Sequence, residues 1–227
     1  MPRGRQSKGA CIYCAAEFAK GGALKHLASC AARRAVTVTA QSRQAGSETL
    51  HHLRVQDARR SEFWLHLEVR GSSTLKDVDF YLRRIWLECC GHMSQFSIGG
   101  WLGREIPKSR RVEEVFGWEG KLTHLYDFGT SSETLLRTVG LREGRPTTKH
   151  PVALMARNRI PEARCIDCAL PAAWLCRECL TKEEKRGTLC DEHARAHPHT
   201  NYGRPIRLVN SPRLGMCAYD GPAVPPY

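Results

Sequence analysis

The chain has 227 residues, of which 41% are hydrophobic and 26% charged, so it can build a packed core and is not broadly disordered. No apolar run approaches the ~20 residues of a membrane-spanning helix, and the basic N-terminus has no apolar signal core. We therefore expect a cytoplasmic protein with reduced cysteines and no membrane partner. The formal net charge is +12, with eleven lysines and arginines against three acidic residues in the first sixty positions.

The first ten residues are expected to form a basic tail, and a cysteine–histidine cluster follows over residues 11–32. Its donors have the spacing C-x2-C-x11-H-x3-C: Cys11, Cys14, His26 and Cys30. Four such donors suit a tetrahedral zinc ion, because a C-x2-C pair reaches one ion and an x3 spacing places two donors one helical turn apart. The pattern predicts a C2HC zinc finger with its helix over residues 23–31 and with Phe18 and Leu24 in its small core.

The basic N-terminal third leaves two interpretations open. Lys25, Arg33 and Arg34 on and after the finger helix suit phosphate contacts, whereas the other helix side chains are poor readers of bases. Contact with nucleic acid is one interpretation, and a solvated basic arm is the other. Residues 33–61 show little periodicity and are expected to be a basic linker, with a short strand at Ala35–Thr39.

A globular pattern occupies residues 62–160. Alternating apolar residues predict a strand at 63–69, and helical spacing of apolar residues up to Gly91 predicts a helix at 75–89. Further expected elements are strands at Met93–Ile98, Leu122–Phe128 and Glu133–Leu141, a short helix at 111–116 and an apolar run at Val152–Arg157. This order of strands and helices with mixed connections indicates an α+β core.

Residues 161–227 form a second cysteine- and histidine-rich module. The run C-x2-C-x7-C-x2-C-x10-C-x2-H-x3-H-x-H supplies eight candidate ligands in four pairs: Cys165, Cys168, Cys176, Cys179, Cys190, His193, His197 and His199. Four pairs predict two zinc ions in a cross-brace, in which alternate pairs share an ion. The first and third pairs would bind one ion and the second and fourth pairs the other, with Cys217 as a rival to the last two histidines.

With the finger, this makes three zinc ions, all in sites closed by four protein donors. A catalytic zinc keeps one position open, so closed sites favour a structural role, and we predict no catalytic residues.

The remaining cysteines and histidines show no ligand spacing. Cys89 is expected in the core beside Cys90, and His51, His52 and His92 are expected on the surface. The triplet at Asp127 is expected to be a strand end in which the carboxylate bonds locally. A lower-ranked hypothesis places an enzyme pocket around Asp127, Glu88 and His92.

Three segments together resemble one known family, the plasmid pRiA4b ORF-three-like domain. Residues 73–98 resemble the helix and strand that open that domain, and LTHLYDFG at Leu122–Gly129 is similar to its Y-D-F-G signature. The stretch from PVALMARNRIPEARC to NSPRLGMCAYDG resembles the zinc-binding extension of a subfamily that also has an N-terminal finger. Thr130, Ser131 and Ser132 stand where many members have an acidic residue and an aromatic. The resemblance implies an α+β core and a link to mobile elements, and it supplies no established activity.

These observations favour a non-enzymatic zinc-binding adaptor that contacts nucleic acid or protein. The first alternative is a basic DNA-binding regulator that uses the finger and linker for phosphate contacts. The second alternative is an enzyme with a pocket in the central domain.

Overall fold

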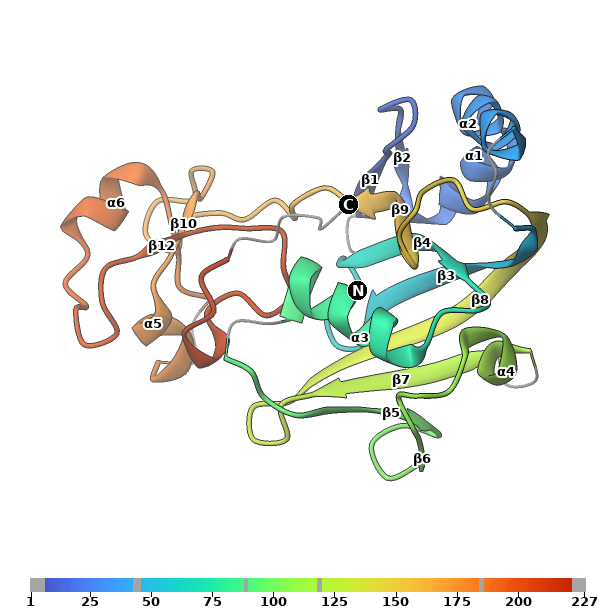
Figure 1. Cartoon of the computed structure of the whole chain (residues 1–227). Coiled ribbons are helices and arrows are strands. Elements are labelled where there is room, and N and C mark those ends of the chain that lie inside the picture. Colours follow the sequence, from blue (N-terminus) through green and yellow to red (C-terminus); the bar gives the residue numbers. More distant parts are fainter. Residues whose placement is uncertain (1–6, 43–45, 88–89, 118–119, 184–185, 222–227) are drawn as a thin grey trace.

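A computed structural model describes residues 7–42, 46–87, 90–117, 120–183 and 186–221 (Figure 1). The protein is a mixed α+β molecule built mainly on one large antiparallel sheet, with helices on both of its faces. A small cysteine-rich module lies beyond the ends of the strands of that sheet, at the left of Figure 1.

The large sheet has the strand order β2-β1-β9-β4-β3-β8-β7-β5-β6 within the described residues, and all neighbours are antiparallel. Its strands are β1 Lys8–Cys11, β2 Glu17–Ala19, β3 Glu48–Asp57, β4 Trp64–Arg70, β5 Ser94–Ile98, β6 Arg104–Ile106, β7 Lys121–Tyr126, β8 Ser132–Gly144 and β9 Val152–Asn158. The C-terminal module has a second antiparallel sheet of β10 Trp174–Leu175, β11 Thr188–Leu189 and β12 Ile206–Arg207.

The described helices are α1 Ala23–Ser29, α2 Ala31–Gln41, α3 Leu75–Leu82, α4 Val112–Phe116, α5 Arg177–Thr181 and α6 Asp191–Ala196. A π-helical turn at Arg83–Leu87 continues α3, and 3-10 turns lie at Lys20–Gly22 and Met216–Ala218. The start of α3 is fixed by a capping box, in which the Thr74 and Asp77 side chains each accept a hydrogen bond from the other's backbone N–H.

The two faces of the sheet bury different partners. Because side chains alternate along a strand, Leu65 and Leu67 of β4 face the main core under α3 and α4, whereas Trp64 and His66 face the opposite side. Trp64 belongs to a second cluster that it shares with the N-terminal finger. The finger and α3 therefore cover opposite faces of the same strand.

The expected strands and helices of residues 62–160 are present, with boundaries shifted by a few residues, and β6 was missed. The linker expected at residues 33–61 is wrong, since this stretch contains most of α2 and all of β3. Ala35–Thr39 is helical because the Cys30 thiol accepts a hydrogen bond from the Arg33 N–H at the helix start. The Thr37 hydroxyl also donates to the Arg33 carbonyl. The β-branched residues of this stretch favour a strand and give no sign of this hydrogen bond.

The finger is not a separate arm but an extension of the sheet. Strand β1 pairs with β9 from Gly9 to Cys11, and the Ile12 N–H donates to the Met155 carbonyl (3.1 Å). Gly9 allows this approach, because a Cβ there would lie 2.2 Å from the Trp64 ring. The Trp64 indole N–H also donates to the Ser7 hydroxyl (2.9 Å).

The segment after the C-terminal module returns to the main sheet. The Asn158 side chain donates to the Asn210 side chain (2.6 Å), and the Ser211 hydroxyl donates to the Trp86 carbonyl. Arg213 is fully buried against Asp127 at the end of β7. Over the described residues, no helix is both long and apolar enough to cross a bilayer.

Candidate metal centres

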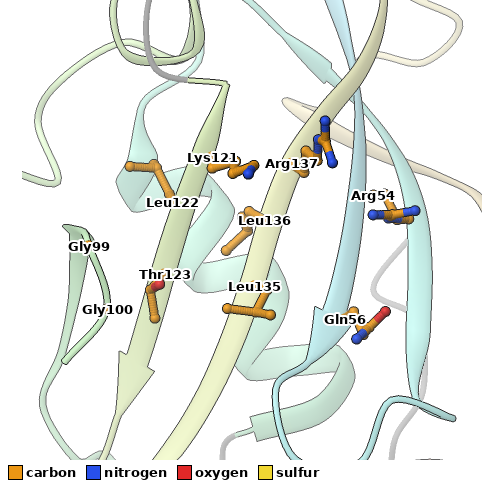
Figure 2. Close-up of a pocket in the computed structure, with 10 residues that line it drawn as sticks. All are labelled: Arg54, Gln56, Gly99, Gly100, Lys121, Leu122, Thr123, Leu135, Leu136 and Arg137. Carbon is orange, nitrogen blue, oxygen red and sulfur yellow. The ribbon is translucent and has the colours of Figure 1, made fainter.

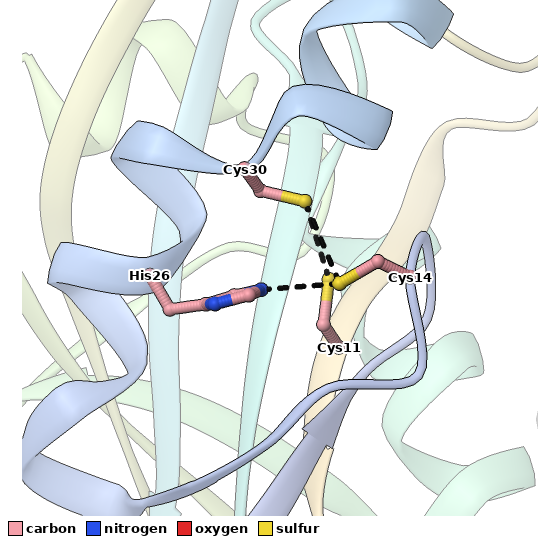
Figure 3. A group of neighbouring side chains, drawn as sticks. All are labelled: Cys11, Cys14, His26 and Cys30. Atoms are coloured by element: carbon pink, nitrogen blue, oxygen red, sulfur yellow. Dashed lines mark hydrogen bonds between the residues drawn. The ribbon is translucent and has the colours of Figure 1, made fainter.

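The four predicted finger ligands converge on one point (Figure 3). Cys11 and Cys14 come from the β1–β2 hairpin, His26 from α1, and Cys30 from the junction of α1 and α2. Cys11 Sγ lies 3.9 Å from Cys30 Sγ, Cys30 Sγ lies 3.7 Å from Cys14 Sγ, and Cys14 Sγ lies 3.4 Å from His26 Nε2.

These separations match the edges of the tetrahedron that donor atoms form around zinc. With Zn–S bonds of about 2.3 Å and Zn–N bonds of about 2.05 Å, two sulfurs lie about 3.8 Å apart, sulfur and nitrogen about 3.5 Å, and two nitrogens about 3.3 Å. Disulfide bonding is excluded, because bonded sulfurs would lie about 2.05 Å apart. The donor set and its spacing therefore fit a structural zinc ion.

The eight C-terminal candidates separate into two clusters: Cys165, Cys168, Cys190 and His193, and Cys176, Cys179, His197 and His199. This is the alternating arrangement that the four pairs predict for a cross-brace. In the first cluster the sulfurs of Cys168 and Cys190 are 3.7 Å apart. His193 Nδ1 lies 3.6 Å from Cys165 Sγ and 3.2 Å from Cys190 Sγ.

The second C-terminal cluster uses both histidines whose roles the sequence left open. Cys179 Sγ lies 3.3 Å from His197 Nε2 and 3.2 Å from His199 Nδ1, and the two nitrogens are 3.2 Å apart. The other nitrogen of His199 lies 3.3 Å from the Glu183 carboxylate. Such a carboxylate–histidine pair orients an imidazole toward a metal.

The first C-x2-C turn of each module has the same left-handed residue after its second cysteine. Ala15 and Ala169 directly follow the second cysteine, and both have positive φ, 57° and 59°, although neither is a glycine. The Ala15 N–H donates to the Cys11 carbonyl (2.9 Å), and the Ala169 N–H donates to the Cys165 carbonyl (3.1 Å). Left-handed backbone in alanine costs about 1–2 kcal/mol, so these turns need a compensating interaction, which a bound ion would supply.

The thiols differ in how readily they ionise without a cation. Burial raises the pKa of Cys11 to about 11 and that of Cys179 to about 12. The backbone N–H of Arg33 lowers the pKa of Cys30 at the start of α2. A cation that binds such clusters must displace protons from the buried thiols, so acid should favour its release.

The finger core and its basic side chains differ from expectation. Phe18 is partly buried in the finger core as predicted, and there it lies beside Trp64. Leu24 is exposed, and Leu27 fills the core because Trp64 sets the buried face of α1. Lys25 and Arg34 are exposed.

Arg33 was predicted to contact phosphate, but its side chain is bonded within the protein and is not available for that contact. Its guanidinium donates to the Leu27 carbonyl (3.0 Å) and lies 3.9 Å from the buried Glu68.

Three residues meet at the end of β7, and one of them, Cys217, was predicted as a rival ligand of the C-terminal zinc. Cys217 is absent from both C-terminal clusters, and its thiol lies 3.1 Å from Asp127 Oδ2. His92, expected on the surface and grouped with Asp127 only in the lower-ranked enzyme hypothesis, places Nδ1 3.7 Å from the same oxygen. Asp127 Oδ1 accepts from the Gly129 and Thr130 N–H groups, which is the local bonding expected for a strand end. Cys89 and Glu88 lie outside the described residues.

The paired histidines of β3 are also less exposed than predicted. His51 is only 2% exposed, and it lies on the face opposite His52. His52 Nε2 lies 2.8 Å from His66 Nδ1, so the two rings share a hydrogen bond on the finger side of the sheet.

The fold and these clusters define an α+β protein with cysteine–histidine clusters suited to metal ions at both ends. No protein-family model matches the sequence, and no curated protein does. Among solved structures, the chain is similar to the crystal structure of a protein of unknown function, MM3350 from Methanosarcina mazei Go1. The identity is 14% over 48% of this chain and 69% of that chain, and the TM-score is 0.42.

Proposed function

We propose that this chain is a non-enzymatic adaptor whose two ends are held by three structural zinc ions. The observation that carries the proposal is the set of three four-donor clusters, each with donor separations near those of tetrahedral zinc. Four protein donors leave no coordination position for a substrate, so the ions would supply stability rather than chemistry.

The proposal includes membership of the plasmid pRiA4b ORF-three-like family and a link to mobile elements. Its support is the order of the three segments, in which a finger precedes, and a cysteine–histidine module follows, the strand that ends in Y-D-F-G.

An adaptor needs an exposed surface, and the finger side of the sheet offers one. Strands β3, β7 and β8 leave this face open beside α1, in a depression of about 370 Å³ (Figure 2). Arg54, Lys121 and Arg137 lie along it and form no ion pair with any described residue. Leu135 between them is 40% exposed. We call the surface of Arg54, Lys121, Leu135 and Arg137 the basic sheet face.

The basic sheet face also favours a second candidate function, nucleic-acid binding by a regulator. The contact would then use Arg54, Lys121 and Arg137 rather than Arg33, which is bonded within the protein. Unpaired cations on an open surface attract phosphates and release counterions when they bind.

Metal analysis of the purified full-length protein tests the main proposal. We expect three zinc ions per chain to survive dialysis against a weak chelator, and fewer than three would contradict it. A photo-crosslinking amino acid at Leu135 should capture the partner in cells, whereas the same group at Phe80, exposed on α3, should not.

Polarisation of labelled duplex DNA separates the two candidates. A nucleic-acid regulator should lose affinity by orders of magnitude between low and moderate salt, and the double variant Arg54→Glu/Arg137→Glu should bind roughly tenfold or more weakly. The double variant Lys76→Glu/Arg84→Glu, on α3 and the turn that continues it, is the charge-matched control on the far face. If the variants bind DNA as tightly as the wild type does, the regulator is contradicted and the adaptor remains.

A further inference from the structure

Three donors outside the zinc clusters meet where the C-terminal tail touches the main sheet. The ligand atoms of Cys90, His92 and Cys217 all lie within 4.8 Å of one another. Cys90 and His92 belong to the loop before β5, and Cys217 belongs to the 3-10 turn near the end of the described chain. We propose that these three side chains form a fourth metal site, open at one coordination position, for a zinc-like divalent cation.

The donor set determines which ion the site would take. Two thiolates and one imidazole favour zinc or cobalt(II) over magnesium or calcium, which prefer oxygen. The same set of two cysteines and one histidine occurs in zinc sites that keep a fourth position for water or another small ligand. Cys90 is exposed and the His92 side chain is 42% exposed, so solvent can reach that position.

Buried polar groups surround the three donors. His92 Nδ1 is buried and has no hydrogen-bond partner among the described residues, although its ring is partly exposed. Asp127 Oδ2 lies 3.7 Å from that nitrogen and accepts from the Cys217 thiol (3.1 Å). The fully buried Arg213 donates to the same oxygen and to the Ser132 hydroxyl (2.8 Å). This carboxylate is held in place to orient the ligands of a metal.

Backbone strain gives independent support. Among the described residues, four that are not glycine have positive φ: Ala15, Asp127, Ala169 and Cys217. Two of them are the alanines of the zinc-cluster turns, and the other two, with φ of 61° and 45°, meet at the proposed site. Strain of this kind persists where the surroundings impose it and gathers at functional sites.

The proposal goes beyond the three closed clusters and does not depend on them. An ion here would join the central sheet to the tail that follows the C-terminal module. Its open position would accept water or a small anion, which the closed clusters cannot do.

The test uses reduced full-length protein after dialysis against a weak chelator, so that only firmly held zinc remains. Cobalt(II) is then added, because its visible absorption reports thiolate ligation and coordination number. We expect one further cobalt per chain, and we expect azide to shift its spectrum because only an open site accepts an added ligand. The zinc retained beforehand tests the proposed function, whereas the added cobalt tests this site alone.

Variants locate the site. Cys90→Ser, His92→Asn and Cys217→Ser should each weaken cobalt binding by roughly tenfold or more while retaining the firmly held zinc, which shows that they fold. Met93→Ala removes a neighbouring side chain that is 72% exposed and should bind like the wild type. Absence of added cobalt, or equal binding by all variants, would overturn the proposal. A Cys90–Cys217 disulfide formed without reductant, combined with no cobalt uptake after reduction, would also overturn it.

Discussion

At the scale of single residues, the cysteines divide by their backbone surroundings. Cys14 and Cys168 are exposed at turns, whereas Cys30 and Cys176 cap the starts of α2 and α5. The caps accept backbone N–H groups with or without a metal, but the turns depend on strained alanines that follow them. The backbone at the turn cysteines should therefore change most when the metal is lost.

Cys168→Ser should remove at least one zinc ion per chain. The substitution leaves three donors in its cluster. In a cross-brace the ligands of both clusters alternate along the same short segment, so loss of one ion disturbs the other cluster. Zinc released to a colorimetric chelator measures the loss. Asp167→Ser, an exposed change between the two cysteines of that turn, should keep the full zinc content, and equal zinc in both variants would disprove the ligand assignment.

His52 and His66 should make stability depend on pH. Burial lowers their pKa values from 6.5 to about 4 and about 3, so the folded state keeps both rings neutral. Below pH 6.5 the unfolded chain binds protons that the folded chain does not, and the free energy of unfolding falls with the pH. The loss should be about 1 kcal/mol per histidine between pH 7 and pH 5.5.

Urea unfolding at several pH values in that window measures this slope. The double variant His52→Gln/His66→Gln should show a flatter dependence whatever its absolute stability. A variant slope equal to that of the wild type would assign the pH dependence to other groups.

At the scale of elements, a strand pair and an indole ring join the finger to the sheet. Strand β1 continues the sheet at β9, and Trp64 of β4 packs under α1 with Leu27 and Met155. The finger helix therefore has a fixed orientation beside the basic sheet face, and Leu24 of α1 and Arg54 of β3 line one common depression.

Gly9→Val should loosen the finger from the sheet. Its Cβ would meet the Trp64 ring at 2.2 Å and the Arg157 carbonyl at 2.5 Å, so β1 or Trp64 must move. We expect a loss of roughly 1–3 kcal/mol in the free energy of unfolding and faster amide exchange in β1. Gly21→Ala, in the same finger with no atom within 4 Å of its Cβ, is the control. Unchanged exchange in Gly9→Val would contradict the docked arrangement.

At the scale of the whole molecule, the candidate metal clusters and the main core are separate. The main core between the sheet and α3 contains no cysteine among its described members, whereas the C-terminal cluster consists largely of cysteine and the N-terminal cluster contains Cys11 and Cys30. The core can persist without metal, and the C-terminal module has little else to hold it.

A strong chelator should therefore unfold residues 165–207 while the central sheet remains. Hydrogen exchange followed by mass spectrometry should show lost protection in the C-terminal module and retained protection in β3, β4 and β8. Addition of zinc should restore the module. Simultaneous loss of protection in the central strands would show that the ions support the whole fold.

The sequence predicted the parts of the molecule that depend on neighbouring residues. A C-x2-C turn closes within a few residues, so spacing alone identified ten of the twelve donors that the structure gathers into three groups, and it left His197 and His199 open against Cys217. The strand at β4 and the helix at α3 were likewise predicted, because each buries one face and shows the corresponding period.

The tertiary structure decided what depends on residues far apart in the chain. Strand β3 has a polar outer face, so its sequence resembles a linker, and its pairing with β4 and β8 makes it a strand. The β-branched residues of α2 favour a strand, but the thiol cap and the hydroxyl hydrogen bonds allow them to be helical. Leu24 and Leu27 could not be distinguished until Trp64 fixed the buried face of α1. The meeting of Cys90 and Cys217 has no local signal at all, because a contact across more than a hundred residues is set by how the elements pack and not by spacing along the chain.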